Sequence, residues 1–333
     1  VLLAGVNYEH SGGLLLHAGD AAHELFELFN VNWNKEILFG VNLGGDIHHI
    51  WCSDPVGQGS PAILDPTQEM VDCYRMEDGS KPITGYSNNG QTPIINPASG
   101  YVEEGFASTE RKGRWPSGVR NMFTNREPRF YASINFPGQV WKLNHVLSLW
   151  YSGDDGKKNA GSDYCKTGYL MRKYNDLNIT RQPWIVRDLV WIYFRVGELY
   201  LNCAEALNEY GGPTAEVYEY MNAIRARAGL KALESGLTQE QMRDEIKLER
   251  RIEMAFENHR FFDVRRWKDA PKTENGPIHC LDIMSGNFLQ DESFYKRVVC
   301  EGRIFESPKH YLFPIPQDEI DKNPRKLAQN PGW

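Results

Sequence analysis

The run from Glu249 to Trp267 carries the densest charge in the sequence and contains Glu249, Glu253 and Glu257, spaced four residues apart. On a helix these carboxylates share one face, where like charges repel by about 0.2–0.5 kcal/mol per pair unless cations lie between them. Two such carboxylates could serve as the acid and the base of a glycosidase. This spacing therefore raises carboxylate-pair hydrolysis as one possible chemistry.

The arginines around this run favour a structural interpretation instead. They are Arg195, Arg225, Arg227, Arg250, Arg251, Arg260, Arg265 and Arg266. Arginine suits bidentate pairing with carboxylates in partly buried places, and buried charges are normally paired. We therefore expect an interhelical ion-pair network covered by Phe261, Phe262 and Trp267, and we keep the acid–base pair as the alternative.

Aromatic residues in turn-rich sequence form a second set of candidates. Carbohydrate binding needs flat apolar faces beside polar groups, and loops on a rigid scaffold often carry function. The candidates are Trp51 with Asp54, Tyr86 with Asn89, Tyr101, and Trp115. Each of these aromatic residues could instead fill a small core beneath the loops. Four further tryptophans lie in apolar or strand-like runs, where we expect core positions: Trp141, Trp150, Trp184 and Trp191.

Other chemistries have little support in the sequence. No C-x-x-C, G-x-S-x-G or G-x-G-x-x-G motif occurs. His17, Asp20 and His23 could approach one another on a helix, but three ligands of this kind are too few for a metal site. We expect no metal, cofactor or catalytic residue. Cys280 and Cys300 could form a disulfide in an oxidising compartment.

Charge and hydropathy exclude further classes of protein. The 37 basic and 44 acidic side chains give a net charge of −7, which argues against a dedicated nucleic-acid binder. No run of about 20 apolar residues exists, so the sequence predicts no membrane-spanning helix. Leu3-Ala4-Gly5 is similar to the end of a lipoprotein signal, but Val6 stands where the lipidated cysteine would be.

The type of secondary structure that the sequence predicts changes along the chain. Residues 20–42 predict a helix and a strand. Residues 43–186 are rich in Gly, Pro, Asn and Ser and predict loops, with short strands at 130–136 and 140–149. Residues 187–270 predict a helical scaffold, and residues 271–333 predict an irregular C-terminal segment.

Three helices are expected in the scaffold. An apolar stripe from Val196 to Tyr210 predicts the first, and residues 214–228 predict the second, ended by Gly229. The capping-box pattern at Thr238–Gln241 opens the third. Helical pairs of about 34 residues are typical of tetratricopeptide repeats. We therefore expect a mainly α fold, in which tetratricopeptide-like helical pairs support a large loop-rich region.

Several motifs together resemble the SusD/RagB family. They are residues 71–79 (VDCYRMEDG), 125–129 (NREPR), 168–173 (GYLMRK), 195–206 (RVGELYLNCAEA), 222–230 (NAIRARAGL), 249–267, 311–316 (YLFPIP) and 329–333 (QNPGW). The matches follow the family's order over residues 20–333. Gly197 and Glu127 depart from the usual Ala and Asp. Members are longer, so the resemblance implies one SusD-like domain over residues 1–333 that lacks its N-terminal part.

This resemblance implies a non-catalytic lipoprotein on the outer-membrane surface of Bacteroidetes. Such a protein would capture oligosaccharides and deliver them to a SusC-like TonB-dependent transporter. Its only membrane attachment would be a lipid anchor that this chain lacks. A peptide-binding member of the same family and an adaptor that binds only the transporter are the alternatives, beside the hydrolase considered above.

Overall fold

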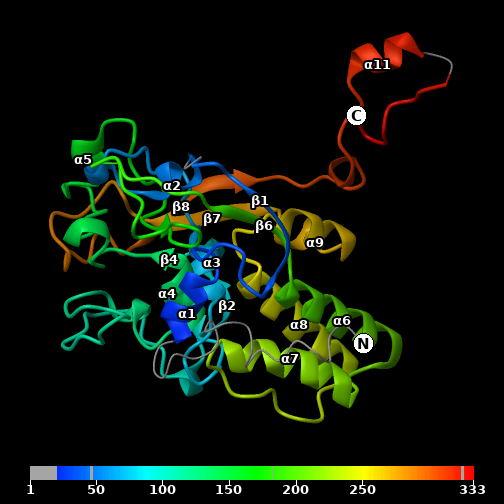
Figure 1. Ribbon diagram of the computed structural model, residues 1–333, viewed down its shortest axis with the longest axis horizontal. Coiled ribbons are helices and arrows are strands. Elements are labelled where there is room, and N and C mark those ends of the chain that lie inside the picture. The colour runs from blue at the N-terminus through cyan, green and yellow to red at the C-terminus, as the bar shows by residue number, and fades with distance from the viewer. Residues whose placement is uncertain (1–20, 46–47, 182, 324–325) are drawn as a thin grey trace.

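The computed structural model describes residues 21–45, 48–181, 183–323 and 326–333, so His17, Asp20 and the Leu3–Val6 segment lie outside the described residues. A helical scaffold packs beside a loop-rich region, and the C-terminal segment extends away from both (Figure 1). The scaffold helices are α6 (Val196–Gly211), α7 (Ala215–Arg227), α8 (Gln239–Glu253) and α9 (Arg260–Arg266).

The three long helices begin where the sequence predicts. Thr238 accepts a hydrogen bond from the Gln241 backbone N–H, and the Gln241 side chain bonds back to the Thr238 N–H, which forms the capping box of α8. Gly229 follows α7 with a φ of 73°, a left-handed conformation that favours glycine. Apolar residues of α6, α7 and α8 share one core, with Leu201, Met221 and Met242 fully buried.

The loop-rich region is organised by short helices and small sheets. Its helices are α1 (Ala21–Glu27), α2 (His48–Ser53), α3 (Gln68–Cys73), α4 (Pro128–Ser133) and α5 (Lys157–Ala160). The C-terminal part adds α10 (Ala270–Thr273) and α11 (Gln317–Lys322). An aromatic-rich core lies beneath the loops, where Phe123, Phe130 and Phe136 stack on one another.

Four two-stranded antiparallel sheets lie in the described residues. Their strands pair as β1 (Ile37–Asn42) with β6 (Val190–Arg195), β2 (Ile83–Ser87) with β3 (Thr92–Ile95), β4 (Ile134–Asn135) with β5 (Leu170–Met171), and β7 (Gly276–Leu281) with β8 (Arg297–Arg303). The fold is therefore mixed rather than mainly α. The β7–β8 sheet lies in the segment for which the sequence predicted no regular element.

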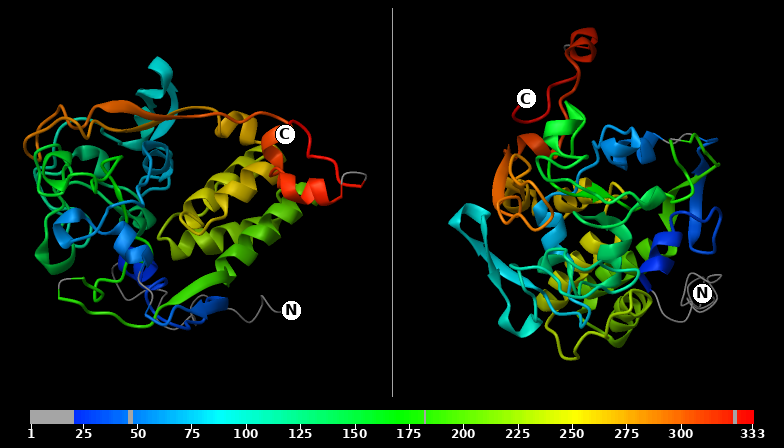
Figure 2. Two further views of the ribbon diagram at one scale, coloured as in Figure 1. Left: turned by 90° about the horizontal axis from the view of Figure 1, so that it is seen from above. Right: turned by 90° about the vertical axis from the view of Figure 1, so that its left-hand side faces the viewer.

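Two strand predictions are wrong. Residues 128–133 form α4, because Pro128 supplies the fixed φ that suits a first helical position, and only Ile134 and Asn135 continue as a strand. Between 140 and 149 the backbone turns at Leu143, where φ is 55°, and a single bridge joins Val140 to Val146. The predicted helix near 20–30 and the strand near 36–42 are confirmed as α1 and β1. Figure 2 shows α6, α7 and α8 side by side on one side of the molecule.

Candidate functional site

The glutamates of the charged run are held in ion pairs. Glu253 lies 2.8 Å from Arg195 Nη1 and 3.1 Å from Arg129 Nη1, and it also pairs with Arg227. Burial alone would raise the pKa of Glu253, but the guanidiniums of Arg227, Arg195 and Arg129 outweigh it and hold that pKa well below its ordinary range. A buried carboxylate that stays ionised in this way is a poor proton donor.

The other carboxylates complete the network. Glu249 Oε1 lies 2.6 Å from Arg129 Nη1 and Oε2 lies 3.3 Å from Arg225 Nη1. Glu257 lies 2.7 Å from Arg195 Nε and 2.6 Å from Lys173 Nζ. The geometry therefore supports the structural interpretation of the charged run and gives no support to an acid–base pair.

The predicted aromatic cover of this network is wrong. Phe261 and Phe262 are exposed, and Phe261 stacks on Phe313 with ring centroids 5.7 Å apart. Trp267 Nε1 donates to Glu205 at 2.8 Å instead. Buried partners from the loop-rich region, Arg129 and Lys173, enclose the glutamates in their place.

The six predicted ligand-binding residues do not come together. Figure 2 places α2 and the β2–β3 hairpin on opposite sides of the loop-rich region. Trp51 is 38% exposed on α2. The Asp54 carboxylate is buried and accepts hydrogen bonds from Trp141 Nε1, Lys142 Nζ and Asn175 Nδ2 at 2.8–2.9 Å. Asp54 therefore anchors the structure beside Trp51 rather than offering a free oxygen.

The remaining predicted residues have structural partners. Tyr86 is partly exposed on β2, and its hydroxyl donates to Asp72 at 2.8 Å. The Asn89 carbonyl lies 2.9 Å from His279 Nε2, while its side chain is in an exposed turn.

Tyr101 and Trp115 belong to the main core, with 5% and 8% exposure. Burial contradicts the expectation that these two rings are exposed platforms: Trp115 packs on Tyr131, and Tyr101 hydrogen-bonds to Glu103 and lies under Arg126.

A small hollow beside Trp51 has the composition expected of a sugar platform. It has a volume of about 130 Å³ and is lined by Trp51, Trp184, Arg181 and Thr180 over a floor that includes Ile50 and Ile179. The Arg181 guanidinium lies 4.8 Å from the centre of the Trp51 ring. Trp184 is 65% exposed, so its predicted core position is wrong. The apolar neighbours Ile185 and Val186 misled the prediction, because they are exposed as well.

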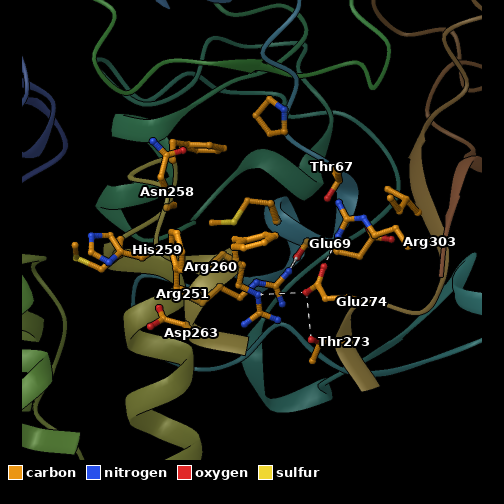
Figure 3. Close-up of a pocket in the computed structure, with 18 of the residues that line it drawn as sticks. Thr67, Glu69, Arg251, Asn258, His259, Arg260, Asp263, Thr273, Glu274 and Arg303 are labelled. Carbon is orange, nitrogen blue, oxygen red and sulfur yellow. Dashed lines mark hydrogen bonds and ion pairs between the residues drawn. The ribbon is translucent and has the colours of Figure 1, made fainter. Parts of the chain in front are cut away.

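A larger cavity lies elsewhere and was not predicted. Its volume is about 810 Å³, and it lies between the beginning of α3, the α8–α9 connection and the beginning of β7 (Figure 3). Arg251, Arg260, Glu69 and Glu274 lie close together within it. The charged run contained the signal for this cavity, but the sequence alone could not separate arginines that pair inside the network from arginines that face a cavity.

The described residues bear on the predictions about metal sites, membrane-spanning helices and a disulfide. Within them, no group of three or more His, Cys, Asp or Glu side chains could hold a metal ion. No described helix is long and apolar enough to cross a membrane. Cys280 and Cys300 lie on the paired strands β7 and β8 as free thiols.

This chain is similar to known proteins in both sequence and fold. Residues 30–333 match the SusD family. SusD-like protein P2 of Formosa agariphila is 31% identical over 150 residues, which are 43% of this chain and 26% of that protein. SusD-like protein P38 of the same species is 34% identical over 208 residues, which are 52% of this chain and 40% of that protein. The chain thus spans less than half the length of these curated relatives.

Solved structures extend the likeness over nearly the whole chain. A SusD-like protein from Bacteroides fragilis superposes with a TM-score of 0.72 and 28% identity, covering 96% of this chain and 58% of that one. A SusD-like carbohydrate binding protein from the same species has a TM-score of 0.62 at 20% identity, covering 91% of this chain and 60% of that one, and shows likeness of fold alone. SusD family proteins are non-catalytic binding proteins. With its ordered motifs, its fold and the match over residues 30–333, this chain belongs to the SusD family.

Proposed function

We propose that this protein is a non-catalytic glycan-binding protein, and that the hollow beside Trp51 holds the sugar. The observation that carries the proposal is the pair of exposed indoles, Trp51 and Trp184, at the rim of one hollow with the Arg181 guanidinium. Indole faces suit the C–H surface of a sugar ring, and the guanidinium can donate to its hydroxyls.

The surroundings of the hollow hold this platform in place. Asp54, next to the Trp51 helix, is fixed by three donors, and Arg181 also donates to the Gly59 carbonyl. Both walls, α2 and residues 179–181 with Trp184, belong to the region from 43 to 186 in which the sequence predicted ligand binding. A site whose polar groups are held in place before binding loses less entropy when the ligand arrives.

Isothermal titration against plant, host and microbial glycans tests the proposal, with a peptide library as a separate arm. Trp51→Ala and Trp184→Ala should each weaken glycan binding about tenfold or more, equivalent to about 1.4 kcal/mol. Tyr210→Ala is the control, because Tyr210 is 95% exposed at the end of α6 and outside the hollow. Binding of peptides but of no glycan would favour the peptide alternative, and unchanged affinity in both Trp variants would refute the site.

We also propose that the full-length protein is lipid-anchored on the outer-membrane surface and delivers its ligand to a SusC-like TonB-dependent transporter. Membership of the SusD family supports this proposal. Purification of tagged full-length protein from its own cells should recover such a transporter, and protease added to intact cells should degrade the protein. Protection from protease, or recovery without a transporter, would contradict the proposal. Recovery of the transporter without any glycan binding would favour the adaptor.

A further inference from the structure

The large cavity of Figure 3 is separate from the Trp51 hollow, because the two share no lining residue. Its walls come from five parts of the chain: the beginning of α3, the end of α8 with the turn into α9 and part of α9, the segment 273–278, Arg303 at the end of β8, and Phe313. The cavity can hold several sugar-sized groups, since its volume of about 810 Å³ falls within the range of small-molecule sites.

Cationic side chains in this cavity outnumber the carboxylates available to them. Arg303 Nη1 lies 3.1 Å from Glu274 Oε2, and Arg260 Nε lies 3.8 Å from the other oxygen of the same carboxylate. Arg251 donates to the Glu69 backbone carbonyl at 3.0 Å, and the described residues place no carboxylate at ion-pair distance from it. Among the described residues, Glu274 is therefore the one carboxylate at ion-pair distance from any of these three guanidiniums, and Figure 3 shows the Glu69 carboxylate in the same cavity.

The other acidic groups of the lining are engaged elsewhere. Glu69 Oε1 lies 2.6 Å from His279 Nδ1 and also accepts the His279 backbone N–H. Asp263 pairs with Arg250 at 2.7 Å. Burial raises the pKa of Asp65 to about 7, which removes much of its negative charge at neutral pH.

Burial and a neighbouring guanidinium change the pKa of Arg260. Burial, and then the neighbouring Arg251, lower the pKa of Arg260 to about 10. Two guanidiniums held this close repel each other until an anion lies between them. Arginine forks match the planar geometry of a carboxylate and the oxygens of a sulfate.

The rim of the cavity is apolar. Phe261 and Phe313 stack at 5.7 Å with their planes within 13°, and Arg265 lies 3.4 Å above the Phe261 ring. Phe262 and Phe313 are 65% and 72% exposed. Exposed aromatic faces beside partly exposed cations suit a ligand that has both apolar faces and a negative group.

We propose that this cavity binds an acidic saccharide, with the anionic oxygens of a carboxylate or a sulfate ester on Arg251 and Arg260 and a sugar face against the exposed rings of Phe262 and Phe313. The proposal rests on the proposed function in so far as the ligand is a glycan, but it names a second site and the charge of its ligand.

Titration with three tetrasaccharides of different charge tests this inference. The probes are tetragalacturonic acid, a sulfated carrageenan tetrasaccharide and neutral maltotetraose. At least one acidic probe should bind at least tenfold more tightly than maltotetraose in 50 mM NaCl, and its affinity should fall in 500 mM NaCl because salt screens the guanidiniums. A preference for one acidic probe distinguishes a carboxylate ligand from a sulfate ligand.

Arginine variants test whether the acidic probe binds in this cavity. Arg251→Gln and Arg260→Gln should each weaken the acidic probe at least tenfold, while Arg260→Lys, which keeps the charge, should weaken it less. Arg243→Gln is the matched control, since Arg243 lies on α8 outside the cavity and pairs with Glu209 on the surface. Arg303→Gln provides a further variant, because Arg303 pairs with the same carboxylate from β8, and thermal unfolding checks that every variant is folded.

The outcomes separate this inference from the proposed function. Loss of acidic binding in the cavity variants but not in Trp51→Ala supports the second site. Equal affinity for all three probes, no binding of either acidic probe, or full binding in the Arg251 and Arg260 variants would overturn the inference. In each of those cases, the proposal that a neutral glycan binds at the Trp51 hollow would be unaffected.

Discussion

Arg195 shows how single residues join the two regions of this molecule. It precedes α6 as its N-terminal cap residue, is 1% exposed, and pairs with Glu36 and with Glu253 and Glu257 of the charged run. The sequence predicted an Arg–Glu network from the spacing of the glutamates. It could not identify Glu36 or Lys173 as members, because both are far away in sequence and no periodic pattern marks them.

Removing one charge of this network should destabilise the protein strongly. Glu253→Gln leaves the buried guanidiniums of Arg195 and Arg227 short of a counter-charge, so we expect a loss of about 3–5 kcal/mol in the free energy of unfolding. Urea denaturation of the variant and the unmodified protein measures this difference in the free energy of unfolding. Glu209→Gln, which breaks an exposed pair with Arg243, should cost less than about 1 kcal/mol. Equal stability of the two variants would show that the network is not structural.

At the scale of elements, the sequence predicted helices well and short strands poorly. The helix signals are local: the Thr238 capping box, Gly229, and the stripe on α6 all act within a few residues. The strands β4 and β5 have two residues each, and they form because distant segments meet there rather than because of their own pattern. The wrong core prediction for Trp184 has the same cause, because the exposure of this residue depends on tertiary packing that an apolar run of sequence does not reveal.

The two threonine caps of the scaffold should differ in their contribution to stability. The Thr238 hydroxyl accepts from the Gln241 N–H at 3.2 Å, whereas Thr214, at the start of α7, makes no such side-chain bond. Thr238→Ala should therefore lower the free energy of unfolding by about 1 kcal/mol, and Thr214→Ala by clearly less. Thermal unfolding of both variants measures the difference. A larger loss for Thr214→Ala would contradict the assignment of the caps.

At the scale of the whole molecule, one buried charge network and one aromatic core hold the loops on the helical scaffold. The 40 aromatic residues divide accordingly: Phe123, Phe130 and Tyr169 fill the core, while Trp51 and Trp184 remain at the surface. Composition predicted both uses of the aromatics. It could not assign Tyr101 and Trp115 to the core, because burial in a loop-rich region depends on tertiary packing alone.

Acid should loosen the contact between the two regions. The pKa values of Glu253 and Glu257 are lower in the folded protein than their ordinary value of 4.5, because neighbouring arginines and Lys173 outweigh the effect of burial. Their contribution to stability is therefore present above about pH 4.5 and is lost as the pH falls through the folded pKa values. Melting temperatures should fall once the pH drops below about 4.5. A protein equally stable at pH 3 and pH 7 would contradict this.

The most direct test of the central claim is hydrogen–deuterium exchange with and without a saturating glycan identified by titration. Binding at the hollow should slow exchange of backbone amides in α2 and in residues 179–184, because the ligand lies against Trp51 and Trp184. Peptides from the far end of α6, near Tyr210, should exchange at the same rate in both states. Protection confined to other segments, with α2 and residues 179–184 unchanged, would contradict the assignment of the glycan to this hollow.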